Sequence, residues 1–191
     1  MRASSLGFQV GAVTRIFAAS LACSVVFRVG LAAAAPPARG QDQIATTAGA
    51  ARVLRKERLD SIYADRTWHW KDGAGYFQAK NREFKAWVGK GRKATYAEGS
   101  WTVNNNGRLC FRAAWHSLRG RKRASTCFAH RSDGKNIYQR RLPRGKWYIF
   151  SHIPARPGDE INKLQPGDQV SKSYHANKSY VQRARKMRKR R

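Results

Sequence analysis

The feature that most constrains the fold is a series of short aromatic and β-branched segments between residues 66 and 153, each followed by a turn signal. Asn104-Asn105-Asn106-Gly107 and Ser132-Asp133-Gly134-Lys135 are two such signals. Closely spaced turns of this composition join neighbouring antiparallel strands. We therefore expect a mainly β fold, in which a single antiparallel meander closes into a small barrel or sandwich.

Two cysteines, Cys110 and Cys127, lie in predicted strands 108–116 and 124–130, on either side of the turn-like segment LRGRKR. If they face each other, Leu109 opposes Phe128. The large apolar side chains then share one face of the pair and both cysteines share the other, because side chains alternate along a strand. This pattern predicts a cross-strand disulfide, with two free buried thiols as the alternative.

Residues 1–35 read as a leader. A basic start and an apolar stretch from Ile16 to Leu31 precede Ala34-Ala35, which is typical of a cleaved secretory signal peptide. Arg28 interrupts the apolar stretch and leaves it well short of the ~20 residues that span a membrane. We expect a periplasmic or secreted bacterial protein. An uncleaved anchor and a lipoprotein attached at Cys23 remain alternatives.

The segments that flank the strands have different compositions. Residues 36–51 are small and polar, which predicts a flexible spacer. Residues 51–64 have helical apolar spacing and predict an amphipathic helix that covers one end of the domain. We place the domain at 52–170 and a basic tail at 171–191, where nine residues are basic and none is acidic.

The net charge of +28 indicates contact with an anionic polymer or surface. For an exported protein the available anions are lipopolysaccharide, acidic glycan and lipid headgroups, and no nucleic acid is expected. A highly charged surface without a dedicated ligand is the alternative. The candidate polyanion-binding residues are Arg119, Arg121, Lys122, Arg123, Arg140, Arg141, Arg144, Lys146, Arg185, Lys186, Arg188, Lys189, Arg190 and Arg191.

Several blocks between residues 65 and 170 resemble a proteobacterial family of small exported proteins, domain of unknown function 995. The resemblance implies no known activity and carries over no site residues. The blocks are DRTWHWKDGAGYF, YAEGSWTV, GRLCFRAAW, TCFAHR, IYQRRLPRGKWYIF and DEINKLQPGDQV. The matching positions are Trp68, Trp70, Gly73, Gly75, Gly99, Trp101, Cys110, Trp115, Cys127 and Trp147.

The sequence contains no motif for catalysis or for metal binding. The five histidines lack ligand spacing, and neither a nucleophile motif nor a carboxylate pair is visible. We therefore expect no catalytic residue, metal or cofactor, and favour a non-enzymatic domain that binds an anionic envelope component. A calycin-like barrel that holds a small apolar ligand is the alternative, and a glycan-acting enzyme is a third hypothesis.

Overall fold

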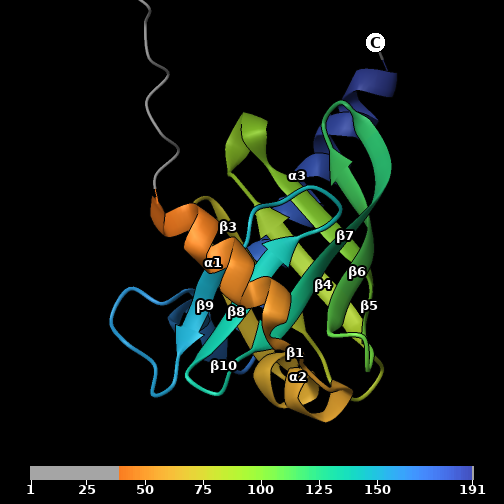
Figure 1. Cartoon of the computed structure of the whole chain (residues 1–191). Coiled ribbons are helices and arrows are strands. Elements are labelled where there is room, and N and C mark those ends of the chain that lie inside the picture. Colours follow the sequence, from red (N-terminus) through yellow and green to blue (C-terminus); the bar gives the residue numbers. More distant parts are fainter. Residues whose placement is uncertain (1–38, 191) are drawn as a thin grey trace, which may run out of the picture. The chain divides into compact units, whose positions relative to one another are not determined.

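The protein is described by a computed structural model that covers residues 39–190, so the predicted leader and Cys23 lie outside the described residues. Ten antiparallel strands form one sheet that curls into a half-barrel (Figure 1). The strands are β1 Arg52–Val53, β2 Arg66–Trp70, β3 Gly73–Phe77, β4 Glu83–Val88, β5 Thr95–Val103, β6 Arg108–Ser117, β7 Gly120–Ser132, β8 Asn136–Arg141, β9 Tyr148–His152 and β10 Leu164–Pro166. The helices are α1 Arg39–Ala50, α2 Lys56–Tyr63 and α3 Ser171–Lys189, with short 3-10 turns at Gly91–Lys93 and Glu160–Lys163.

Strand order confirms the predicted meander. Strands β2 to β9 follow one another in chain order across the sheet, β10 pairs with β2 at one edge, and β1 pairs with β7. Each strand therefore lies beside its neighbour in sequence, as the closely spaced turns require.

The β6–β7 hairpin has the predicted register. Leu109 opposes Phe128, and Cys110 opposes Cys127, to which it is joined by a disulfide. The LRGRKR segment, by contrast, is not mainly a turn. Ser117 pairs with Gly120, so only two residues form the loop and residues 121–123 extend β7. A two-residue loop allows pairing to begin at once, and successive side chains from this basic stretch then point to opposite faces of the sheet.

Aromatic rings fill the inside of the curl. Trp68 on β2 lies 5.2 Å from Phe128 on β7, measured between ring centroids, although four strands lie between β2 and β7 in the sheet. Phe111 stacks on Phe84 at 4.5 Å, and Trp101 is fully buried. These rings are among the side chains that would line a ligand cavity in the calycin-like alternative, and here they pack against one another.

Helix α2 covers one end of the half-barrel, as predicted, but it is shorter than the expected 51–64. Its buried side chains are Leu59, Ile62 and Tyr63. The Tyr63 ring contacts both Phe77 and Phe150 from opposite parts of the sheet. Residues 52–53 form strand β1 instead, because they pair with the far end of β7.

The predicted flexible spacer 36–51 is wrong for residues 39–50, which form α1. The end of this helix is fixed by Arg131, whose guanidinium donates hydrogen bonds to the carbonyls of Ala48 and Gly49. A cation at a helix C-terminus satisfies carbonyl groups that lack a partner within the helix. This cap comes from a residue more than eighty positions away, so local composition did not reveal it.

The basic tail 171–191 is helix α3 for most of its length, and it packs on the outer face of β4, β5 and β6 (Figure 1). The domain boundary predicted at residue 170 is therefore too early. None of the helices in the part of the chain described here is long and apolar enough to cross a membrane.

Candidate anion-binding face

The outer face of β5, β6 and β7 carries one row of side chains from each strand. Alternation places Tyr96 and Glu98 on this face of β5, Arg112, Ala114 and His116 on β6, and Arg121 and Arg123 on β7. The register sets Ala114 between Glu98 on one side and Arg123 on the other. Lys122 points to the inner face, beside Trp115.

Helix α3 lies on this outer face and is anchored by its first three turns. Tyr174, Asn177 and Val181 are buried, at a spacing that places them on one side of a helix. The Asn177 side-chain amide donates hydrogen bonds to the backbone carbonyls of Val88, Gly89 and Thr95. The three carbonyls lie at the end of β4, in the β4–β5 connection and at the start of β5, so one side chain fixes the helix to the sheet.

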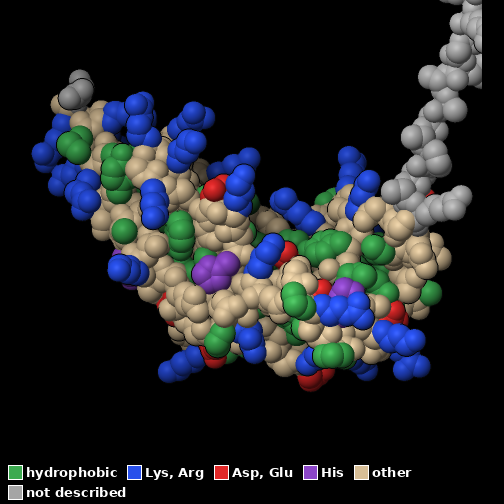
Figure 2. All heavy atoms as spheres, turned by 90° about the vertical axis from the view of Figure 1, so that its left-hand side faces the viewer, with side chains coloured by type: hydrophobic (Ala, Val, Ile, Leu, Met, Phe, Trp, Pro, Cys, Tyr) green, Lys and Arg blue, Asp and Glu red, His purple; other side chains and the backbone are tan. Residues whose placement is uncertain are grey.

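The remaining turns of α3 are mostly exposed and lie beside the β6–β7 loop. A groove between them is lined by Arg119 and Gly120 from the hairpin and by Gln182 and Arg185 from the helix, with further lysines and arginines of α3 along one side. Figure 2 shows Lys and Arg side chains gathered on this projecting arm, at the upper left. We call the arm and the adjoining outer face of β5–β7 the basic face.

Two predicted basic clusters, distant in sequence, thus meet on the basic face. One is the hairpin cluster and the other is the C-terminal cluster, of which Arg191 lies outside the described residues. No acid occurs in residues 99–132 or 169–191, which supply most of this surface. The members that the structure places here are Arg119, Arg121, Arg123, Arg185, Lys186, Arg188, Lys189 and Arg190.

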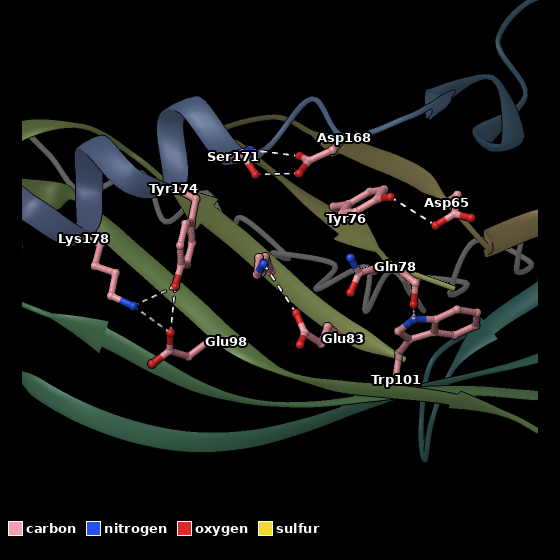
Figure 3. Close-up of polar contacts among 11 residues, drawn as sticks. Asp65, Tyr76, Gln78, Glu83, Glu98, Trp101, Asp168, Ser171, Tyr174 and Lys178 are labelled. Carbon is pink, nitrogen blue, oxygen red and sulfur yellow. Dashed lines mark hydrogen bonds and ion pairs between the residues drawn. The ribbon is translucent and has the colours of Figure 1, made fainter. Parts of the chain in front are cut away.

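Glu98 is the acid on the basic face, and its charge is compensated. Its Oε2 accepts hydrogen bonds from the Tyr174 hydroxyl at 2.7 Å and from Lys178 Nζ at 3.1 Å (Figure 3). The hydrogen bond from Tyr174, together with Lys178, holds the pKa of Glu98 below its ordinary value. Hydrogen bonds from Lys178 Nζ to the Tyr174 hydroxyl, at 3.1 Å, and to Glu98 raise the pKa of Lys178 to about 12. The pair therefore stays ionised and adds no net negative charge.

His116 lies between this pair and the arginines. Its ring stacks on Tyr96 at 4.6 Å, and its Nε2 lies 3.9 Å from Glu98 Oε1 without a hydrogen-bond partner. Burial lowers the pKa of His116, and the charges of Arg121, Arg185 and Lys178 lower it further, against the opposing effect of Glu98. At neutral pH the imidazole is neutral and extends the polar surface without adding a cation.

A depression opens on the basic face where the side chains are small. Its floor is formed by the Ala114 side chain and by the backbone at Gly99, Ala113 and Ala124, and its walls by Glu98, Arg112, Arg121, Arg123 and Ser125. The volume is about 480 Å³, which lies within the range of about 300–1,000 Å³ that is usual for small-molecule sites. The wall on the β7 side is cationic, and the opposite wall presents the Glu98 carboxylate, which is paired with Lys178.

The remaining predicted cluster is separate from the basic face. Arg140 and Arg141 belong to β8 and pair with residues 128 and 129 of β7, far along that strand from the hairpin loop, and Arg144 and Lys146 follow in the β8–β9 connection. Arg140 also lies over the Trp147 ring at 5.0 Å, and Arg131 lies over the same ring at 5.8 Å. Part of this cluster therefore serves packing.

A buried polar network lies inside the curl and had no signal in the sequence. His130 Nε2 lies 2.7 Å from the Tyr63 hydroxyl, and the Gln139 amide donates to the same hydroxyl at 2.7 Å. Tyr148 donates to Gln139 Oε1, and His130 Nδ1 contacts the Gly107 carbonyl at 3.2 Å. Burial lowers the pKa of His130 to about 4. Because the network satisfies its own donors and acceptors, it stabilises the core as a neutral cluster.

Sequence reasoning also missed Arg112 and Lys178 as members of the basic face. Arg112 stood alone between apolar residues, and Lys178 lay in a segment taken as a tail. Strand alternation places Arg112 on the same face as Cys110 and Cys127, but it does not show that this face is the basic one, and nothing local indicates the contact of Lys178 with Glu98.

The fold and the basic face define a small antiparallel β half-barrel with a cationic outer surface. Residues 28–170 match the family described as protein of unknown function (DUF995), and the chain belongs to this family. Comparisons with curated proteins and with solved structures gave no match. The family match ends at Val170 and α3 begins at Ser171, so the basic face combines strands inside the matched region with a helix outside it.

Proposed function

We propose that this chain is an exported, non-enzymatic β domain that binds an anionic component of the bacterial envelope, such as lipopolysaccharide, acidic glycan or lipid headgroups, through its basic face. The observation that carries the proposal is the convergence of the hairpin and C-terminal cationic clusters on one projecting arm. Because like charges repel, two cationic clusters that lie side by side are stabilised when an anion binds between them.

The position of the few acids supports the same conclusion. Glu98 is paired with Lys178. The arm is built from residues 99–132 and 169–191, and neither of these stretches contains an Asp or a Glu. The field of the arm is therefore cationic and extends toward any anionic surface that approaches it. An electrostatic attraction of this kind weakens as salt rises, since the Debye length falls from about 10 Å at 0.1 M to about 3 Å at 1 M.

The test compares two variants that remove the same number of charges. One is Arg185→Gln/Lys186→Gln/Arg188→Gln/Lys189→Gln on the arm, and the control is Lys135→Gln/Arg141→Gln/Arg144→Gln/Lys146→Gln, four exposed cations elsewhere. Binding to vesicles with anionic lipid and to lipopolysaccharide is measured at several salt concentrations. With about 1 kcal/mol per cation near an anionic surface, we expect the arm variant to lose affinity about a hundredfold or more. Equal losses in the two variants would rule out the basic face as the binding surface.

Export is the second part of the proposal and is supported by the predicted leader 1–35. We expect the mature protein to begin after Ala34 or Ala35 when it is recovered from the periplasm or medium. Cell fractionation with N-terminal sequencing checks this. Recovery of the intact, reduced chain from the cytoplasm would contradict export.

A further inference from the structure

We propose that the depression around Ala114 is a binding site for a sugar phosphate, the phosphate group lying against Arg112, Arg121 and Arg123 and a sugar hydroxyl donating to Glu98. This inference rests on the proposed function because it names the ligand chemistry of the same basic face. The inference goes beyond the proposed function because a sugar phosphate needs a shaped site, whereas attraction to an anionic surface needs only charge.

The three arginines are placed by register around one small residue. Arg123 is directly opposite Ala114, Arg121 is its neighbour two positions along β7 on the same face, and Arg112 is two positions from Ala114 on β6. No hydrogen bond or ion pair within the described chain occupies their guanidinium groups. Guanidinium groups bind phosphate through paired N–H donors, and several of them suit a group that carries two negative charges.

The opposite wall distinguishes this site from a simple anion patch. Glu98 on β5 and Arg123 on β7 lie on either side of Ala114 on β6. Because neighbouring strands are about 5 Å apart, the backbones at Glu98 and Arg123 are separated by about 10 Å. Its Oε2 is occupied by Tyr174 and Lys178, which leaves Oε1, 3.9 Å from His116, as an acceptor at the rim. An ionised carboxylate has only acceptors, so it accepts a hydrogen bond from a hydroxyl and offers no donor to a second anionic group. Ser125 adds a hydroxyl on the side of Arg112.

The floor determines what lies between the phosphate and the hydroxyl. Ala114 is 9% exposed, and its methyl group is the one side chain on the floor, so the floor is small and shallow. A sugar ring presents C–H groups on its faces and hydroxyls at its edge, which suits a small apolar floor with polar walls. A long acyl chain would find no deep apolar slot here, because the inside of the sheet is filled by the aromatic core.

The experiment titrates the full chain with glucose 6-phosphate, inorganic phosphate and glucose, followed by calorimetry and by NMR shifts of β5–β7 amides. We expect saturable binding of glucose 6-phosphate, weaker binding of inorganic phosphate, and no saturable binding of glucose. Ala114→Leu fills the depression without changing any charge, and Arg123→Gln removes one phosphate contact. Each should weaken glucose 6-phosphate binding about tenfold or more, while the exposed Arg141→Gln should have little effect.

The outcomes separate this inference from the proposed function. One outcome is that the wild-type chain binds anionic vesicles, while Ala114→Leu, Arg123→Gln and Arg141→Gln all bind glucose 6-phosphate with the same affinity. This outcome overturns the sugar-phosphate site and leaves the basic face as the vesicle-binding surface. If the wild-type chain binds neither probe, both fall. Circular dichroism checks that Ala114→Leu is folded, and Arg123→Gln tests the site independently of that result.

A second arm identifies the source of the phosphate. Vesicles that carry lipid A are compared with phosphatidylglycerol vesicles of equal surface charge. Preference for lipid A that is lost in Ala114→Leu assigns the site to a phosphorylated glycolipid. Equal binding to the two vesicles, together with tight binding of free glucose 6-phosphate, assigns it to a soluble sugar phosphate. A preference for lipid A that survives in Ala114→Leu would overturn the site.

Discussion

The two faces of the same sheet are built on different principles. The inner face buries aromatic rings such as Phe77, Phe84 and Trp101 against one another, and its polar groups form a closed network around His130. The outer face carries arginines, Glu98 and His116, and α3 covers only part of it. The inner face therefore supplies stability, whereas the outer face keeps its charged side chains accessible.

Removing an inner ring should have the largest effect. Trp101 is fully buried, and its indole N–H donates to the Gln78 carbonyl at 2.8 Å. Trp101→Ala leaves a cavity and an unpaired carbonyl, so we expect the free energy of unfolding to fall by about 3–5 kcal/mol. Urea unfolding measures it. Trp147→Ala is the control, since that ring is only partly buried and its stacked arginines contribute about 0.5–1 kcal/mol. Similar losses would contradict the division between the two faces.

The inner network predicts a pH dependence of stability. Because the pKa of His130 is about 4 in the folded chain against an ordinary value of 6.5, protonation favours the unfolded state. Its stabilising contribution is complete above pH 6.5 and is lost as the pH falls toward 4. We expect His130 to account for a loss of about 2 kcal/mol between pH 7 and pH 5.

Urea unfolding at these two pH values checks this loss in the wild type, in His130→Gln and in the exposed control His175→Gln. His130→Gln should be less stable at pH 7 but should show a flatter pH dependence. A dependence as steep as that of the wild type would mean that another group is responsible.

The smallest expected effect concerns the attachment of α3 to the outer face. Asn177→Ala removes the amide that serves three backbone carbonyls, and we expect a loss of about 1–2 kcal/mol that is confined to the helix and the β4–β5 connection. Hydrogen exchange should show faster exchange in α3 with little change in β6 and β7. Exposed Ser179→Ala on the same helix is the control. Uniform loss of protection over the whole sheet would show that α3 is an integral part of the core.

Much of the sheet could be predicted from local pattern, and the outer face could be predicted only in part. The paired positions of Cys110 and Cys127 follow from strand alternation and the disulfide that this register allows. The same alternation places Arg112 on the face of the two cysteines, and it adds Arg121 and Arg123 to that face only when the LRGRKR segment is recognised as strand. Basic composition suggested a loop there, yet a two-residue turn was enough.

By itself, the sequence determined the meander, the cross-strand disulfide and the presence of strong cationic clusters, because each depends on residues that are close along the chain. Long-range packing, by contrast, makes the C-terminal segment a helix on the sheet, pairs Lys178 with Glu98, and brings the clusters of the hairpin and the helix side by side. Those contacts join residues about sixty to eighty positions apart. Their energy comes from burial and hydrogen bonds between surfaces that exist only once the sheet has formed.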